Sequence, residues 1–379
     1  MNHDEIYLDH AASTPVRAEV ARLMLQILSD NYANPSSIHR SGQRARKSLE
    51  TAREQVAAAL NAAPREIVFT SGATEAINQA LTGLCARPGM GRLLVSPLEH
   101  KAVLAVAAEL GRRGQQVEML SLQEGAIGPD SLKRAALGEG DVVAAMLVNN
   151  ETGALTDIRH LSNMAHAKGA LLFCDATQAV GVEPVDVQEL HADALVLSAH
   201  KFGGPKGAGA LWFRPGLEPS PFILGGEQER GFRAGTSNLP ALAGMGLALE
   251  LAAAAQQQTH AHLAALQARF EQLALAIEDV RVVAADRPRS VKHTSLQVGG
   301  VDGESLLMAL DGTGVQASIG SACAAGSVEP SHVLLAMGMT EAEAKATLRF
   351  SYGAATSYEQ VEEAVRRLAV AIENCRKAG

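Results

Sequence analysis

Short apolar segments alternate with helical segments between about residue 40 and residue 215, and this alternation restricts the fold more than any other feature. Within the short segments the apolar residues are continuous, as expected of strands that are buried on both faces. The segments cover residues 66–72, 92–100, 141–150, 170–178, 192–202 and 209–215. Amphipathic or alanine-rich stretches lie between them. The pattern predicts an α/β fold with a mostly parallel sheet that carries helices on both faces.

The remainder of the 379-residue chain has a different pattern, which predicts a second, smaller domain. A long helical section is expected from about 238 to 280, because the sequence there is rich in Ala, Leu and Gln. Residues 290–298 and 346–353 resemble strands, and a charged amphipathic helix ends the chain. We therefore expect a large domain over 15–255 and a small α+β domain over 256–379 together with residues 1–14.

Charge and cysteine usage exclude several classes of function. The formal net charge of −8 does not favour binding to phosphate backbones, so we expect no nucleic-acid partner. No run of 18 apolar residues is present and the first residues do not resemble a signal peptide, so we expect a cytoplasmic protein without a membrane partner. The cysteines Cys85, Cys174, Cys323 and Cys375 are scattered, which predicts neither a metal site nor a disulfide framework.

Lys201 and Asp175 each follow an apolar strand, where an unpaired charge is costly. A lysine at a strand end forms a Schiff base with an aldehyde, although taken alone a surface lysine is the commoner explanation. An Asp at such a position keeps a pyridinium nitrogen protonated, although an Asp that caps the next helix is also common. In an open α/β sheet both side chains reach the same crevice.

Three further strand ends carry polar residues. Thr74, with Ala73, begins a helix whose free N–H groups suit a phosphate, although a plain helix cap has the same pattern. His100 is placed to stack on an aromatic ring and to exchange protons, and Asn150 to donate a hydrogen bond. Gln178 lies near Asp175. Five roles at five strand ends match what one pyridoxal 5′-phosphate (PLP) molecule requires.

These residues and the segments around them resemble those of the cysteine desulfurase family, in the branch that serves nitrogenase maturation and iron–sulfur cluster assembly. The matching segments run in order through nearly the whole chain and include YLDHAASTPV, REIVFTSGATEAIN, VNNETG, DATQAVG, SAHKFGGPKGAGAL, GGEQERGFRAGT and SIGSACAAGSVEPSHVL. The resemblance implies an aspartate-aminotransferase-type fold (fold type I) and a PLP-dependent enzyme.

The resemblance also implies roles for individual residues. Lys201 is expected to bind PLP covalently, and His100 to stack on the ring and act as acid and base. The other cofactor-binding residues implied are Ala73, Thr74, Asn150, Asp175, Gln178, Ser198, His200 and Thr236, the last from the partner subunit of a homodimer. Arg349, with Asn34 and Asn150, is expected to bind the carboxylate of L-cysteine.

Cys323 lies in a run of small residues between Gly320 and Pro330, which is typical of an exposed loop. The resemblance implies that this cysteine takes the sulfur of L-cysteine as a persulfide, releases L-alanine, and passes the sulfur to an acceptor or iron–sulfur scaffold protein. Contact with a nascent iron–sulfur cluster is a further expectation for Cys323. The chain ends soon after its last helix, which favours a nitrogenase-type or less specialised role over docking to the housekeeping scaffold.

Two other interpretations of the sequence compete with this one. An aminotransferase or a selenocysteine lyase of the same fold shares every cofactor residue, but an aminotransferase does not need Cys323. A non-catalytic subunit that keeps the fold is the second competitor. The presence of Lys201, Asp175, His100 and Arg349 together with Cys323 argues against it.

Overall fold

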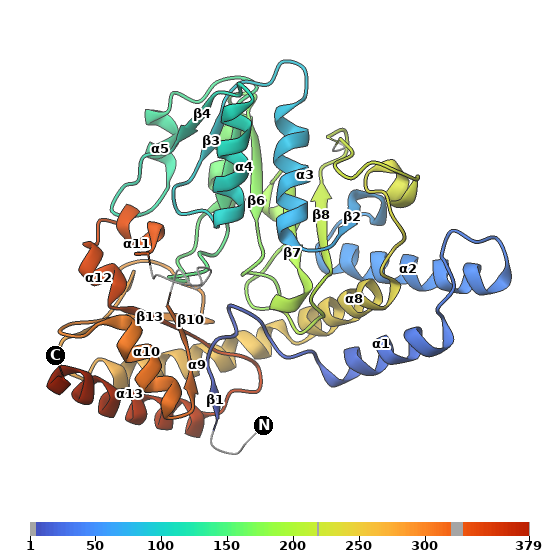
Figure 1. The fold of residues 1–379 in the computed structure, drawn as a ribbon. Helices are drawn as coiled ribbons and strands as arrows, with labels where there is room; N and C mark the ends of the chain where they lie inside the picture. Colours follow the sequence, from blue (N-terminus) through green and yellow to red (C-terminus); the bar gives the residue numbers. More distant parts are fainter. Residues whose placement is uncertain (1–4, 218–219, 320–328, 379) are drawn as a thin grey trace.

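The computed structural model describes residues 5–217, 220–319 and 329–378, and its centre is a seven-stranded sheet (Figure 1). The strands lie in the order β2-β8-β7-β6-β5-β3-β4. Their bounds are β2 Ile67–Thr70, β3 Leu93–Val95, β4 Val117–Met119, β5 Val142–Met146, β6 Leu171–Asp175, β7 Ala194–Ser198 and β8 Gly209–Phe213. The predicted α/β class and mostly parallel sheet are confirmed.

The strand directions bring the predicted functional residues to one edge of the sheet. Strands β3 to β7 run parallel to one another, whereas β8 is antiparallel to both of its neighbours, β7 and β2. Two successive antiparallel pairings give β2 the direction of β7. The carboxyl ends of β2, β3, β5, β6 and β7 therefore lie at the same edge, where α/β folds place their ligands.

Helices cover both faces of this sheet, and alternate residues of each strand enter separate cores (Figure 1). In β6, Leu172 and Cys174 pack on one face and Phe173 on the other. The helices on the Phe173 face are α3 Ala73–Cys85 and α4 Lys101–Arg112. Those on the opposite face are α1 Ala18–Asp30, α2 Arg40–Ala59, α6 Ile158–His166 and α8 Leu239–Ala254. Burial on both faces explains why the strands are apolar throughout.

A four-stranded antiparallel sheet forms a separate core with the C-terminal helices. Its order is β12-β13-β10-β9, and a short strand β1 pairs in parallel with β11. The strands are β1 Ile6–Tyr7, β9 Val280–Val282, β10 His293–Val298, β11 Val315–Gln316, β12 Ser318–Ile319 and β13 Thr347–Ser351. The remaining helices are α5 Pro129–Arg134, α7 Val187–Leu190, α9 Gln256–Ala274, α10 Gly303–Gly312, α11 His332–Ala336, α12 Glu341–Lys345 and α13 Tyr358–Ala378.

The expected helical section from about 238 to 280 is confirmed and consists of two helices, α8 and α9, which meet at Ala255 with a bend of 70°. Strand β4, which lies between β3 and β5 in the chain, was not predicted. Across the described ranges, no single helix is long and apolar enough to cross a membrane, and α8 and α9 satisfy that criterion only when counted together.

Candidate active site

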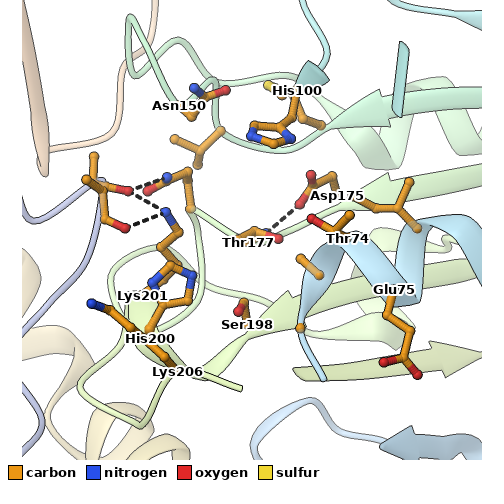
Figure 2. Close-up of a pocket in the computed structure, with 18 of the residues that line it drawn as sticks. Thr74, Glu75, His100, Asn150, Asp175, Thr177, Ser198, His200, Lys201 and Lys206 are labelled. Atoms are coloured by element: carbon orange, nitrogen blue, oxygen red, sulfur yellow. Dashed lines mark hydrogen bonds between the residues drawn. The ribbon is translucent and has the colours of Figure 1, made fainter. Parts of the chain in front are cut away.

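A cavity of about 500 Å³ opens at the edge of the sheet where the strand ends converge. Its lining contains residues from the ends of β2, β3, β5, β6 and β7, together with the N-terminal segment and β13 (Figure 2). The predicted site residues that line it are Ala73, Thr74, His100, Asn150, Asp175, Gln178, Ser198, His200, Lys201 and Arg349. The structure thus brings ten predicted residues to a single cavity.

Lys201 ends a 3₁₀ turn, η2 Ala199–Lys201, that follows β7 directly. Its Nζ donates hydrogen bonds to the carbonyl oxygens of Ala11 and Ala12, at 2.6 and 3.0 Å (Figure 2). Both of these acceptors are neutral carbonyl oxygens, which stabilise a charge less than a carboxylate does. Such a lysine is suited to covalent bonding with a carbonyl compound once it has lost its proton.

Asp175 is the last residue of β6 and is buried. Its Oδ1 accepts a hydrogen bond of 2.9 Å from the backbone N–H of Thr177 (Figure 2). Gln178 donates one bond from Nε2 to the carbonyl of Ala11 at 2.9 Å, and its buried Oε1 has no hydrogen-bond partner among the described residues. This side of the cavity presents a carboxylate and an unpaired amide oxygen.

The N-terminus of α3 faces the cavity with Ser71, Gly72, Ala73 and Thr74 in its lining. Gly209, at the start of β8, allows this arrangement: a Cβ at that position would lie 2.5 Å from the Cα of Gly72. The free N–H groups and the dipole of a 13-residue helix favour an anion at this end.

His100 is the N-cap of α4, and its Nδ1 accepts a hydrogen bond of 3.1 Å from the backbone N–H of Ala102. Burial lowers the pKa of His100, and the charge of Lys201 adds to the effect, while Asp175 opposes it. The ring is therefore neutral at neutral pH. With Nδ1 acting as the acceptor, its proton resides on Nε2.

His200 also lines the cavity, and its Nδ1 lies 3.4 Å from the hydroxyl of Ser13. Burial and, secondly, the charge of Lys201 lower the pKa of His200 to about 4. Its ring is neutral at neutral pH and serves as a hydrogen-bonding group rather than a cation. Ser198, at the end of β7, lies nearby (Figure 2).

Arg349 reaches the cavity from β13, which is one of the two inner strands of the four-stranded sheet. One guanidinium nitrogen donates to the backbone carbonyl of Asn150 at 2.8 Å, and the other to the carboxylate of Asp9 at 2.8 Å. The buried Nε of Arg349 and Oδ1 of Asn150 have no hydrogen-bond partners within the described part of the chain. The Nε–H group of Arg349 is therefore available to donate a hydrogen bond to a ligand.

The sequence interpretation missed several residues that shape the site. Lys206, an exposed residue, also lines the cavity. Glu99, adjacent to His100, is fully buried; burial, and secondly the charge of Asp175, raise its pKa well above the ordinary value. Its Oε1 accepts a bond of 2.6 Å from the N–H of Met146. The position next to His100 was the only available signal, because burial of one carboxyl cannot be read from sequence.

Three predicted residues are not placed at this cavity. Asn34 is exposed, and its Oδ1 accepts a hydrogen bond from the N–H of Ser36. Thr236 lines a neighbouring cavity that also contacts Ser71, and its assignment to the partner subunit stays a prediction. Cys323 lies outside the described residues. Among those that are described, no three His, Cys, Asp or Glu side chains are grouped to hold a metal ion.

The donor set of the cavity fits PLP. The helix N-terminus at Thr74 suits the phosphate, and the buried carboxylate of Asp175 suits a protonated ring nitrogen. The unpaired Oε1 of Gln178 and Oδ1 of Asn150 show that the protein leaves polar atoms unsatisfied at this place. Buried polar atoms without partners are uncommon in folded proteins and indicate a missing ligand or water.

Comparison with known proteins agrees with this geometry. The family model "Aminotransferase class-V" matches residues 6–364. A cysteine desulfurase IscS of Dictyoglomus turgidum is 40% identical over 98% of this chain and 95% of its own length. A cysteine desulfurase IscS of Methanosarcina thermophila is 37% identical over 98% and 93%. The solved structure of a NifS-like protein superposes with a TM-score of 0.91 at 29% identity, covering 98% of this chain and all of the other. The chain therefore belongs to the aminotransferase class-V family and, within it, to the PLP-dependent cysteine desulfurases.

Proposed function

We propose that this cysteine desulfurase removes the sulfur of L-cysteine in the cavity at the sheet edge, with Lys201 binding PLP and Cys323 receiving the sulfur. The observation that carries the proposal is the convergence of Lys201, Asp175, His100 and Arg349 on one cavity. Together they supply a covalent anchor, a ring-nitrogen partner, a proton-exchanging group and a carboxylate-binding fork.

The same residues account for how the cofactor is held. Ala73 and Thr74 at the start of α3, with Ser198 and His200 opposite, are the candidates for binding the phosphate. Asp175 pairs with the ring nitrogen. When bound, PLP supplies an electron sink for bonds at the substrate Cα. Gln178 and Asn150 complete the polar contacts on the ring side.

Arg349 binds the substrate carboxylate by donating a hydrogen bond from Nε, and it thereby orients L-cysteine in the cavity. The pairing with Asp9 holds the guanidinium plane in place before substrate arrives, since a charged hydrogen bond restricts a long side chain. Asn150 is joined to Arg349 through its backbone carbonyl, so the two substrate-binding residues are positioned together.

Proton transfers fall to Lys201 and His100. Lys201 moves the Cα proton once its amine is free, and the Nε2 of neutral His100 exchanges a proton at the substrate sulfur. The thiolate of Cys323 attacks that sulfur: an S–S bond forms, the C–S bond breaks, and the carbon skeleton takes up a proton to leave as L-alanine. The persulfide on Cys323 is the sulfur donor for an acceptor thiol.

The proposals on localisation, subunit assembly and the sulfur acceptor rest on the resemblance to the family. We propose a cytoplasmic homodimer in which the partner subunit contributes Thr236 to the phosphate site, and in which Asn34 joins the substrate site. We propose that the acceptor is an iron–sulfur scaffold protein or another sulfur carrier, with Cys323 in contact with a nascent cluster during delivery. A division into residues 15–255 and 256–379 with 1–14 is consistent with the separate cores of the two sheets.

The test is to measure alanine and sulfide released from L-cysteine with dithiothreitol present, in wild type, Cys323→Ala and the matched control Cys375→Ala. PLP content is checked by absorbance in each protein. We expect the wild type and Cys375→Ala to form both products, and Cys323→Ala to bind PLP but form little of either. Equal activity of Cys323→Ala would instead indicate a β-eliminating or transaminating enzyme.

A further inference from the structure

A second cavity, of about 300 Å³, also borders Lys201, and neither Asp175 nor His100 lines it. Only Lys201 is shared between the linings of the two cavities. The second lining is mainly apolar, with Val180, Val182, Phe202, Leu263 and Tyr352 among its members. None of its lining residues, all within the described ranges, is an Asp or a Glu.

Buried basic groups line this apolar cavity. Lys292, immediately before β10, is only 2% exposed, and its Nζ donates a hydrogen bond of 3.1 Å to the backbone carbonyl of Lys201. An ammonium has three donors, and a buried one is costly unless it is paired with a negative charge. No carboxylate contributes to the pairing of Lys292 in the described structure.

His10 gives an independent indication of a missing ligand. It lines the same cavity and is 7% exposed, and its Nδ1 has no hydrogen-bond partner among the described residues. Gly353 packs directly on the His10 ring, where a Cβ would lie 2.5 Å from Nδ1. Arg17 and Lys201 are the other basic residues of the lining. The cavity thus combines an imidazole nitrogen without a partner and positive charge with apolar walls.

We propose that this second cavity binds a small aliphatic monocarboxylate, whose carboxylate lies beside Lys292 and His10 and whose hydrocarbon part contacts Val182, Phe202 and Leu263. A carboxylate supplies the acceptors that the buried ammonium lacks, and the apolar walls favour a short hydrocarbon chain over a phosphate or sulfate. The site is distinct from the substrate position at Arg349, which does not line this cavity.

Protonation of Lys292 gives the site a pH dependence. Burial, and then the charges of Lys201 and Arg349, lower the pKa of Lys292 to about 7. Among the other groups in the lining, burial and the charge of Lys292 lower the pKa of His10 to about 4, so His10 stays neutral near pH 7. The guanidinium of Arg17 also lines the cavity. Because deprotonation removes the positive charge of Lys292 beside the proposed carboxylate, binding is expected to weaken as pH rises through 7.

The experiment is calorimetric titration of the holoenzyme with butyrate, and with butyramide as the uncharged isostere. Wild type is compared with Lys292→Met and with Lys168→Met, which removes an exposed lysine elsewhere. We expect wild type to bind butyrate saturably and Lys292→Met to bind it about tenfold or more weakly, because the charged hydrogen bond is lost. Butyramide, which cannot form that bond, should not bind. Lys168→Met should bind butyrate as wild type does.

Two further measurements of butyrate binding test the proposal if Lys292→Met does not fold. Wild type alone should bind butyrate more tightly at about pH 6 than at about pH 9. Arg349→Leu should retain saturable butyrate binding although it impairs desulfuration, which separates this site from the substrate site. Equal binding of butyrate and butyramide, no binding by wild type, or loss of binding in Arg349→Leu with retention in Lys292→Met would each overturn the proposal.

Discussion

The guanidinium of Arg349 donates a hydrogen bond of 2.8 Å to the carboxylate of Asp9, a residue 340 positions earlier in the chain. The N-terminal segment is therefore part of the active site, where Ala11 and Ala12 also accept hydrogen bonds from Lys201. Residues at the start of the chain, in the sheet loops and in β13 together position Arg349, the proposed substrate-binding arginine.

Arg349→Lys is expected to raise the KM for L-cysteine by about tenfold or more, because lysine cannot bond Asn150, Asp9 and a carboxylate with one planar group. Steady-state alanine formation measures the change. Arg281→Lys is the matched control, since Arg281 is an exposed residue paired with Glu343. A KM for Arg349→Lys that equals the wild-type value would show that Arg349 does not bind the substrate carboxylate.

Gly209→Ala is expected to weaken PLP binding, because the new methyl group would displace the Gly72 turn and with it the N-terminus of α3. Gly312→Ala is the control: a Cβ there meets no atom within 4 Å. Cofactor dissociation constants from absorbance titration of apoprotein distinguish the two. The explanation fails if Gly209→Ala binds PLP as tightly as Gly312→Ala.

Much of this site was predictable because strand ends can be read from sequence. Lys201 and Asp175 end apolar segments, and parallel strands bring such positions to one edge. The strand β4 escaped prediction because Val117–Met119 is short, half-exposed and contains Glu118. The insertion of antiparallel β8 between β2 and β7 depends on pairing across the whole sheet, which no local pattern encodes.

Contacts between distant segments were the other part that could not be predicted. The Asp9–Arg349 pair, the burial of Glu99 and the burial of Lys292 all depend on contacts between segments that are distant in the chain. The charge of each residue is evident in the sequence, but its burial and partner are not.

Glu229→Gln is expected to lower the free energy of unfolding by about 3–5 kcal/mol, because it breaks a buried charge pair. Glu229 accepts two hydrogen bonds from Arg53, at 2.6 and 2.8 Å, and one of 2.9 Å from the N–H of Phe69. Glu109→Gln disrupts a solvent-exposed pair with Arg113 and should change stability much less. Urea unfolding of both variants measures the difference, and similar losses would contradict the prediction.

His10 is expected to make stability depend on pH in the acid range. Burial, and then the charge of Lys292, lower the pKa of folded His10 from its ordinary value of 6.5 to about 4. Between these values the unfolded chain binds a proton that the folded chain does not, so stability falls as pH falls. The loss from this residue is at most about 3 kcal/mol.

The measurement for this prediction is the free energy of unfolding at several pH values in wild type and His10→Asn. The difference between the two proteins isolates His10 from the carboxyl groups that titrate in the same range. Wild type should lose more stability than His10→Asn between about pH 6.5 and pH 4. Parallel curves would show that folded His10 has an ordinary pKa.

Mass spectrometry of the holoenzyme after borohydride reduction tests the central claim most directly, because reduction fixes the cofactor to the lysine that holds it. Lys201, Lys206 and Lys292 all lie around the two cavities, and we propose the first alone as the cofactor lysine. The prediction is a pyridoxyl group on the proteolytic peptide that contains Lys201, at the position of Lys201. A pyridoxyl group on Lys206 or Lys292, with Lys201 unmodified, would contradict the account.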